Sequence, residues 1–190
     1  MKIKRILYLI LLPGLLSAQI LEWEPAFPTA NDTITIIYNA TEGNAGLVGE
    51  DVVYVHTGVI TNLSDSPSAW RYVKTNWGEN TPETRLTPLG NDRWMLRYHI
   101  KSYYGVPENE TIEQLAFVFR NADARQTGQT AGGGGLFLPI YQQGLNVSLL
   151  TPSQTPVFLD AGDTLKVKAL ATQAERIVLR LNGVEVTAST

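Results

Sequence analysis

The stretch Arg85-Leu-Thr-Pro-Leu-Gly-Asn-Asp-Arg-Trp-Met-Leu-Arg-Tyr-His-Ile100 is the part of the sequence that decides the fold class. Two short strand-like runs, Arg85–Leu89 and Arg93–Ile100, flank Gly90-Asn91-Asp92, and this combination is typical of a β-hairpin with a tight turn. Elsewhere, apolar residues also come in short runs of β-branched and aromatic character between Gly, Pro, Asn, Asp and Thr, with little helical period. The sequence therefore predicts an all-β protein built on an antiparallel β-sandwich.

The sandwich is predicted to occupy residues 19–144. Its expected strands are Thr33–Ala40, Val52–Thr57, Ala69–Lys74, Arg85–Leu89, Arg93–Ile100, Glu113–Arg120 and Leu136–Tyr141. Two polar stretches, Thr57–Ala69 and Asn121–Gly135, are expected to be surface loops, because they lack the apolar residues that a core needs. A short helical turn is expected at Thr111–Gln114.

A second β unit is predicted at residues 157–190, after a linker at residues 145–156. Asn182-Gly183 is a strong hairpin signal within it, and its expected strands are Val157–Leu159, Thr164–Leu170, Arg176–Leu181 and Val184–Thr187. Because an immunoglobulin-like sandwich needs about 100 residues, this unit is interpreted as the start of such a domain. We therefore expect the chain to be the N-terminal piece of a longer protein.

Residues 1–18 are predicted to be a secretory signal peptide. A basic start at residues 2–5, an apolar run at residues 6–16 and the small residues Ser17 and Ala18 before Gln19 form the usual three parts. The apolar run is shorter than the roughly 20 residues of a membrane span. We expect a secreted or cell-surface bacterial protein that has no membrane association after cleavage.

Composition narrows the functional classes further. The chain has 190 residues, with 18 acidic, 15 basic, two His and no Cys, and a formal charge of −3. Removing the predicted signal leaves 12 basic residues against 18 acidic ones, so nucleic acid is not expected as a partner. The lack of Cys excludes disulfides and thiolate metal sites, which for an exported chain fits a bacterial source.

Two candidate binding residues come from strand alternation. In the run Val53-Tyr54-Val55-His56, the two valines share one face, which places Tyr54 and His56 together on the other. His56 and His99 lack the spacing of metal ligands. A hydrogen bond from His56 to a ligand hydroxyl and a purely structural role both remain open.

Three further candidates, Trp70, Lys74 and Trp77, follow these two in the sequence. Trp70, Tyr72 and Lys74 are expected to share a strand face, and Trp77 lies in the loop-like segment Asn76-Trp77-Gly78. Exposed flat rings suit a sugar binder, because the apolar C–H face of a pyranose stacks on an aromatic plane. The alternative is packing of these rings in the core or at an edge, which we expect for Trp94.

Signals for catalysis or metal binding are weak. The acidic residues lie mainly in expected loops with nothing to mark two of them as partners, and a GxSxG motif is absent. The run Gly132–Gly135 lacks the Lys-Ser/Thr of a phosphate loop. Asn121 and Asp123 are candidate Ca2+ ligands, but a flexible surface loop is the favoured interpretation. We expect no catalytic residue, no metal and no cofactor in this chain.

Three segments carry a resemblance to a known class of module. They are Trp23–Thr29 followed by Thr33–Ile36, Val53–Thr61 followed by Trp70–Gly78, and Leu115–Asp123. They resemble N-terminal starch-binding β-sandwich modules, similar to carbohydrate-binding families 25 and 26, of secreted α-amylase-family enzymes from Bacteroidetes-type bacteria. The segment from Leu149 onward resembles the immunoglobulin-like linker domain of such enzymes. Ala124 stands where a Gly would be expected.

The resemblance implies a non-catalytic module that binds an α-glucan such as starch or a maltooligosaccharide. It implies Trp70 and Trp77 as aromatic platforms, Tyr54 and His56 on the strand beside them, and Lys74 as a polar contact. The catalytic domain of the parent glycoside hydrolase is expected beyond residue 190, and any Ca2+ belongs to that enzyme. The alternative is an adhesion or protein-interaction sandwich without a sugar ligand, which burial of both indoles would favour. A self-contained hydrolase is disfavoured.

Overall fold

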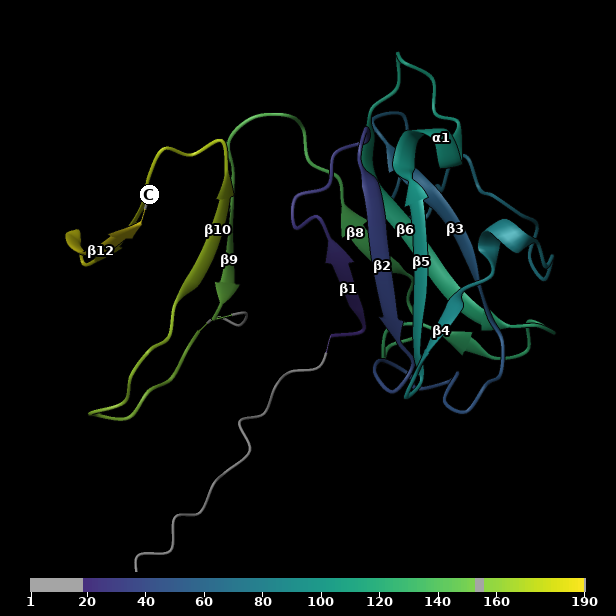
Figure 1. Ribbon diagram of the computed structural model, residues 1–190, viewed down its shortest axis with the longest axis horizontal. Helices are drawn as coiled ribbons and strands as arrows, with labels where there is room; N and C mark the ends of the chain where they lie inside the picture. The colour runs from purple at the N-terminus through teal and green to yellow at the C-terminus, as the bar shows by residue number, and fades with distance from the viewer. Residues whose placement is uncertain (1–18, 153–155, 190) are drawn as a thin grey trace, which may run out of the picture.

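The computed structural model describes residues 19–152 and 156–189, so the predicted signal peptide at residues 1–18 lies outside the described part (Figure 1). The all-β prediction is confirmed, because antiparallel strands make up nearly all the regular structure. One four-stranded sheet has the order β1-β2-β5-β4 and comprises β1 (Leu21–Glu24), β2 (Thr33–Asn39), β5 (Arg93–His99) and β4 (Thr87–Gly90).

The second sheet lies behind the first in Figure 1 and carries the candidate site. It comprises β3 (Val53–Thr61), β6 (Ile112–Asn121), β7 (Thr127–Gly128) and β8 (Leu136–Pro139). The strand β6 is central, with β3 along one edge and β7 and β8 sharing the other. This arrangement leaves the far edge of β3 available to a loop.

Strand alternation supplies the core between the two sheets. Val53 and Val55 of β3 are buried, and Tyr38 of β2 stacks on Phe119 of β6 with ring centroids 4.0 Å apart. Burying a side chain of this size contributes about 1.5–3 kcal/mol. Trp94 of β5 is 4% exposed, which confirms its predicted place in the core. Alternate residues of β3 and β6 consequently point to the outer face of their sheet.

The hairpin that decided the fold class is present. Gly90, the last residue of β4, and the turn residues Asn91 and Asp92 that lead to β5 have φ values of 84°, 52° and 55°, a left-handed conformation that these residue types tolerate. A 3-10 turn, η1 (Pro82–Thr84), precedes β4.

The helical prediction at Thr111–Gln114 is wrong, because Ile112 already begins β6. The described helix is instead α1 (Ile100–Tyr104). The exposed His99 caps α1 through its Nδ1, which accepts a hydrogen bond from the Ser102 backbone N–H. Gly105, at φ 70°, ends this helix.

The predicted loop from Thr57 to Ala69 begins too early. β3 continues to Thr61, because Val59 and Ile60 extend its pairing with β6. The polar residues that follow form the loop. Within the other predicted loop, Asn121–Gly135, the two residues of β7 pair with β6.

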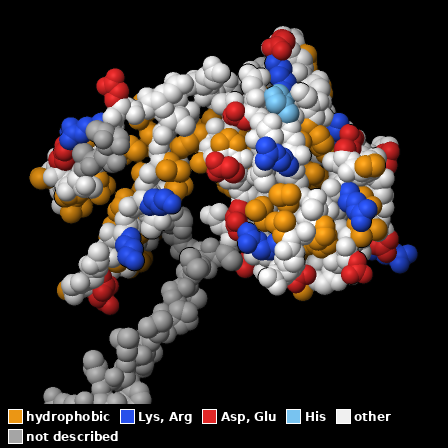
Figure 2. Space-filling view, in the orientation of Figure 1, with side chains coloured by type: hydrophobic (Ala, Val, Ile, Leu, Met, Phe, Trp, Pro, Cys, Tyr) orange, Lys and Arg blue, Asp and Glu red, His pale blue; other side chains and the backbone are white. Residues whose placement is uncertain are grey.

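The C-terminal region forms two antiparallel hairpins. β9 (Asn146–Thr151) pairs with β10 (Lys168–Thr172), and β11 (Ile177–Leu181) pairs with β12 (Val184–Ser189) across the predicted Asn182-Gly183 turn. β9 lies inside the stretch predicted to be a linker, and Val157–Leu159 is not a strand. Hydrophobic side chains are exposed along these hairpins (Figure 2), among them Val147, Leu149, Leu181 and Val184. Among the described residues, the helical segments are too short or too polar to cross a membrane.

Candidate functional site

The loop after β3 returns along the free edge of that strand. Val59 and Arg71 exchange backbone hydrogen bonds of 2.9 and 2.8 Å, and the Leu86 N–H donates to the Val53 carbonyl at 2.9 Å. Both ends of the segment are fixed to β3, and the part between them folds over the outer face of the sheet, where Asn80 contacts Arg120 of β6 and the Ala122 carbonyl. This part of the loop carries Trp77.

Ala69–Lys74 is not the regular strand that the alternation predicted. Only Arg71 forms a bridge with β3, and Tyr72 has a φ of 51°, which breaks the alternation. The expectation that Trp70, Tyr72 and Lys74 share a face is therefore wrong. The Tyr72 hydroxyl donates to Glu110, whereas the Lys74 ammonium donates to the Tyr103 carbonyl at 2.7 Å.

Glu110 ties this loop to the sandwich. Its carboxylate accepts hydrogen bonds from Arg71 Nε at 2.5 Å, from the Thr61 hydroxyl at 2.5 Å and from Tyr72. Burial would raise the pKa of Glu110, but these hydrogen bonds and the charge of Arg71 lower the pKa to about 2. The ionised carboxylate is therefore a structural anchor for the loop that bears Trp70 and Trp77.

The outer face of β3 presents the side chains that alternation predicted. Tyr54 and His56 both point outward and are partly buried by the loop that covers the sheet. Gly58 is next in this row and is fully covered. A Cβ atom at Gly58 would lie 2.9 Å from the Arg71 carbonyl oxygen and 3.4 Å from Trp70 Cβ, so the glycine allows the loop to lie directly on the strand.

Trp70 lies across the sheet from β3 toward β8. Gly58 on β3 pairs with Ala116 on β6, which pairs with Phe137 on β8, so the first two positions of this row carry no side chain beyond a Cβ atom. The indole spans this row, since Cζ2 of Trp70 would lie 3.1 Å from a Cβ at Gly135. Its ring stands edge-on to Phe137 with centroids 6.1 Å apart. Trp70 is thus a half-buried ring supported from below by small residues.

His56 joins the two predicted tryptophan platforms. Its imidazole is nearly parallel to the Trp70 ring, with centroids 6.0 Å apart and an interplanar angle of 26°. The Trp77 ring meets the same imidazole at 76°, with centroids 5.3 Å apart. Trp77 is 51% exposed, far more than Trp94 in the core. These three rings form one aromatic cluster on the outer face, and Phe137 adjoins it through Trp70. We call the four residues Phe137, Trp70, His56 and Trp77 the aromatic row.

A hollow of about 470 Å³ opens beside the aromatic row. It is lined by the residues His56, Val73, Lys74, Thr75, Asn76, Trp77 and Glu79. Glu79 Oε2 accepts a hydrogen bond from the Asn76 backbone N–H at 3.1 Å, which holds the turn that presents Trp77. An exposed indole next to amide, carboxylate and hydroxyl groups is the combination that a polar ligand with an apolar face requires.

The protonation state of His56 follows from its surroundings. Burial, and after it the positive charge of Arg120, lower the pKa of His56 below its ordinary value of 6.5. The imidazole is therefore neutral at pH 7. Its Nδ1 is buried and has no hydrogen-bond partner among the described residues. His56 therefore lies between the two indoles as a neutral imidazole.

Lys74 lines the hollow, but its ammonium group contacts other residues of the protein. Its Nζ lies 4.8 Å from the centre of the Tyr103 ring and 3.8 Å from a Glu83 carboxylate oxygen. Together with the bond to the Tyr103 carbonyl, these contacts hold the segment after Trp70 against α1. The aliphatic part of Lys74 contributes to the wall.

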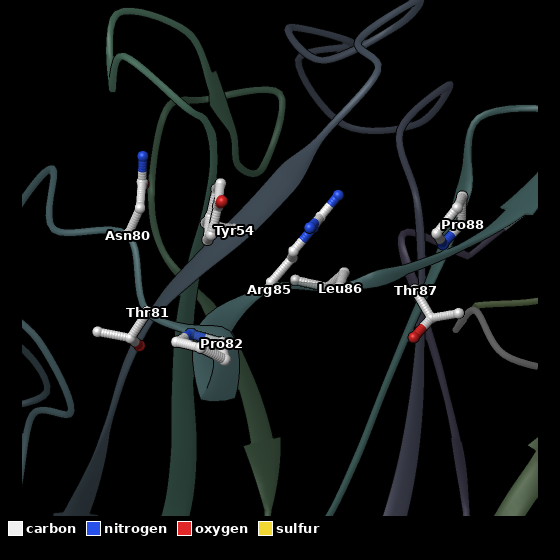
Figure 3. A pocket seen from close by; sticks show the side chains of 8 residues that line it. All are labelled: Tyr54, Asn80, Thr81, Pro82, Arg85, Leu86, Thr87 and Pro88. Atoms are coloured by element: carbon white, nitrogen blue, oxygen red, sulfur yellow. The ribbon is translucent and has the colours of Figure 1, made fainter.

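Tyr54 lies in a neighbouring hollow rather than in the one beside Trp77. This second hollow, of about 490 Å³, is lined by Tyr54, Asn80, Thr81, Pro82, Arg85, Leu86, Thr87 and Pro88 (Figure 3). The side chains of Asn80, Tyr54 and Arg85 project in the same direction from their backbones (Figure 3). The structure therefore brings Trp70, Trp77 and His56 together, with Lys74 in the adjoining wall, and separates Tyr54 from them.

Sequence reasoning missed two parts of the site. Phe137 points outward between the buried Leu136 and Leu138, a position that strand alternation could have revealed. Arg120 is fully buried at the outer face, behind the loop that carries Asn80. A charged residue at the end of the apolar run of β6 gives no such signal.

The candidate Ca2+ ligands are engaged in a turn. Asn121 Oδ1 accepts hydrogen bonds from the backbone N–H groups of Arg125 and Gln126, and Asp123 Oδ1 accepts one from Arg125. Within the described ranges, His, Asp and Glu side chains do not gather in groups of three or more that could hold a metal ion.

These features define an antiparallel β-sandwich with an aromatic, partly polar surface on the outer face of one sheet. Residues 21–127 match a family described as a domain of unknown function, DUF8578, and the chain belongs to that family. The match runs from β1 to the start of β7 and includes His56, Trp70 and Trp77 of the aromatic row, whereas Phe137 lies beyond it. Comparison with curated proteins gives no match.

Proposed function

We propose that the sandwich is a non-catalytic α-glucan-binding module of an exported glycoside hydrolase of the α-amylase family. The exposed indole of Trp77, held at the His56 ring beside a polar hollow, is the observation that supports this most strongly. The apolar face of a glucose ring stacks on such an indole, and each good ring contact contributes on the order of 1 kcal/mol. Trp70 and Phe137 extend the aromatic surface along the sheet.

The polar residues of the hollow supply orientation in this proposal. Asn76 and Glu79 lie next to Trp77 and offer amide and carboxylate groups to sugar hydroxyls. Affinity for a single chain end is modest, because few rings are involved. Attachment to a catalytic domain raises the effective concentration of the module at starch, so that modest affinity is sufficient.

Affinity electrophoresis tests this function directly. The chain from Gln19 to Thr190 is run in native gels with and without soluble starch, and we expect starch to retard it. Trp77→Ala should abolish the retardation, whereas Leu181→Ala, which removes an exposed apolar side chain from β11 in the C-terminal hairpins, should leave it unchanged. Equal mobility of the unmodified chain in both gels would reject α-glucan binding.

The second candidate is an adhesion or protein-interaction sandwich. The exposed apolar residues of the C-terminal hairpins favour it, because isolated two-stranded hairpins are marginally stable and contiguous apolar patches mark interaction surfaces. It requires no sugar at the aromatic row. If starch retards neither the unmodified chain nor the Trp77→Ala variant, the result would favour this candidate.

A further inference from the structure

We propose that the Tyr54 hollow is a second subsite, which binds the anionic substituent of a sugar, either a carboxylate or a phosphate monoester. The inference rests on the proposed function in taking the ligand to be a saccharide. It adds a charge preference that the aromatic row does not provide.

Arg120 gives the hollow a fixed positive charge from beneath. Its guanidinium lies 5.2 Å from the centre of the Tyr54 ring, on a fully buried side chain. Its hydrogen-bond acceptors are neutral: Asn80 Oδ1 at 2.7 Å, the Asn121 carbonyl at 3.1 Å and the Glu79 carbonyl. In the described part of the chain, Arg120 has no carboxylate partner, so its charge is not neutralised locally.

Arg85 adds a second positive charge at the surface. It is exposed, its backbone bridges to Tyr54, and its side chain lines the hollow. Among the described residues, no acidic side chain lies within ion-pair distance of its guanidinium. A guanidinium presents several N–H donors that match the oxygens of a carboxylate or a phosphate.

The rest of the lining fits a sugar ring that carries such a group. No acidic residue is among the lining residues, so nothing in the wall repels an anion. Pro82, Pro88 and Tyr54 offer apolar surface, while Thr81 and Thr87 offer hydroxyl groups. In a protein of net negative charge, the cation of Arg85 in the wall and that of Arg120 behind the Tyr54 ring give this hollow a local positive potential.

The two hollows are neighbours on one strand. Tyr54 and His56 are two residues apart on the same face of β3, a separation of about 7 Å. A single oligosaccharide can therefore place a neutral ring on Trp77 and a charged one beside Arg85. Arg120 pairs with Tyr54 across the sheet and is near enough to His56 for its charge, after burial, to lower the pKa of that residue.

Titrations followed by backbone amide NMR test the subsite. The probes are glucuronate and glucose 6-phosphate, with glucose and inorganic phosphate as references. We expect both charged sugars to shift the amides of Tyr54 and residues 80–88, more strongly than either reference. Arg85→Gln should weaken this binding about tenfold, whereas Arg97→Gln, the same charge change on the exposed face of the other sheet, should not.

Each result decides something. If only one charged sugar binds, the subsite stands and its anion is identified. If Arg85→Gln titrates like the unmodified chain, or if glucose or inorganic phosphate matches the charged sugars, the proposal is overturned. The α-glucan proposal is judged separately, since Trp77→Ala should abolish starch retardation and leave these titrations intact.

Discussion

The Trp77 indole stands edge-on to the His56 imidazole, with ring centroids 5.3 Å apart, while half of the Trp77 side chain remains exposed. Trp77, a loop residue, thus contacts His56 of β3 and still remains accessible to solvent. Large apolar rings on a protein surface are common at binding sites. The geometry of the surrounding loop decides whether this ring stays accessible.

Gly58 is the position where the loop depends most on a missing side chain. We predict that Gly58→Ala lowers the free energy of unfolding by about 1–3 kcal/mol, because the new methyl group would collide with the Arg71 carbonyl and Val73. It should also weaken starch retardation, since Trp70 lies on the same segment. Chemical denaturation and native gels measure both effects.

Gly132→Ala is the matched control for Gly58→Ala. A Cβ at Gly132 would meet no atom within 4 Å, and this glycine has no positive φ. Its stability and its mobility in starch gels should equal those of the unmodified chain. If Gly58→Ala behaves in the same way, close contact between the loop and β3 is not required.

Arg120 should stabilise the loop that separates the two hollows. Arg120→Met removes the donors to Asn80 and to the Glu79 and Asn121 carbonyls, which are then left without this partner. We expect a loss of about 2–4 kcal/mol in the free energy of unfolding. Arg125→Met, at a mostly exposed position, should change it by less than about 0.5 kcal/mol. Equal stabilities of the two variants would contradict a structural role for Arg120.

Some of this arrangement could be predicted from the sequence and some could not. The turn at Gly90-Asn91-Asp92 and the alternation around Val53 and Val55 are local signals, and both give the correct fold class and the outward direction of Tyr54 and His56. The left-handed backbone of Tyr72 could not be predicted in this way, because it accompanies a hydrogen bond from the Tyr72 hydroxyl to Glu110, which lies far along the chain.

The same distinction explains the site. Trp77 follows Asn76 and precedes Gly78, a local pattern that indicated exposure. Arg120 and Asn80 are 40 residues apart, and their contact exists only after β6 and the loop have come together. The division of the surface into two hollows depends on that contact, so it was not visible in the sequence.

Glu110 gives the loop a predictable pH dependence. Its pKa is about 2 in the folded protein and about 4.5 when unperturbed, so the unfolded chain binds more protons in acid. The stabilisation from Glu110 is therefore fully present above pH 4.5 and is lost as the pH falls toward 2. Thermal unfolding across this range should show a smaller pH dependence for Glu110→Gln.

Glu108→Gln serves as the comparison for Glu110→Gln. The Glu108 side chain is 91% exposed, and within the described ranges its ion pair is with Lys101. Its substitution should leave the acid dependence of the unfolding temperature unchanged. A Glu110→Gln variant with the same acid dependence as the unmodified chain would show that the Arg71–Glu110 contact does not anchor the loop.

The most direct measurement of the central claim is the response of the four indole N–H signals in a ¹H–¹⁵N NMR titration with maltoheptaose. Trp77→Phe identifies the Trp77 signal by its disappearance. We expect the Trp77 signal to shift most and the Trp70 signal to follow it, while those of Trp23 and the buried Trp94 stay in place. A Trp77 signal that does not move at saturating maltoheptaose would contradict the account.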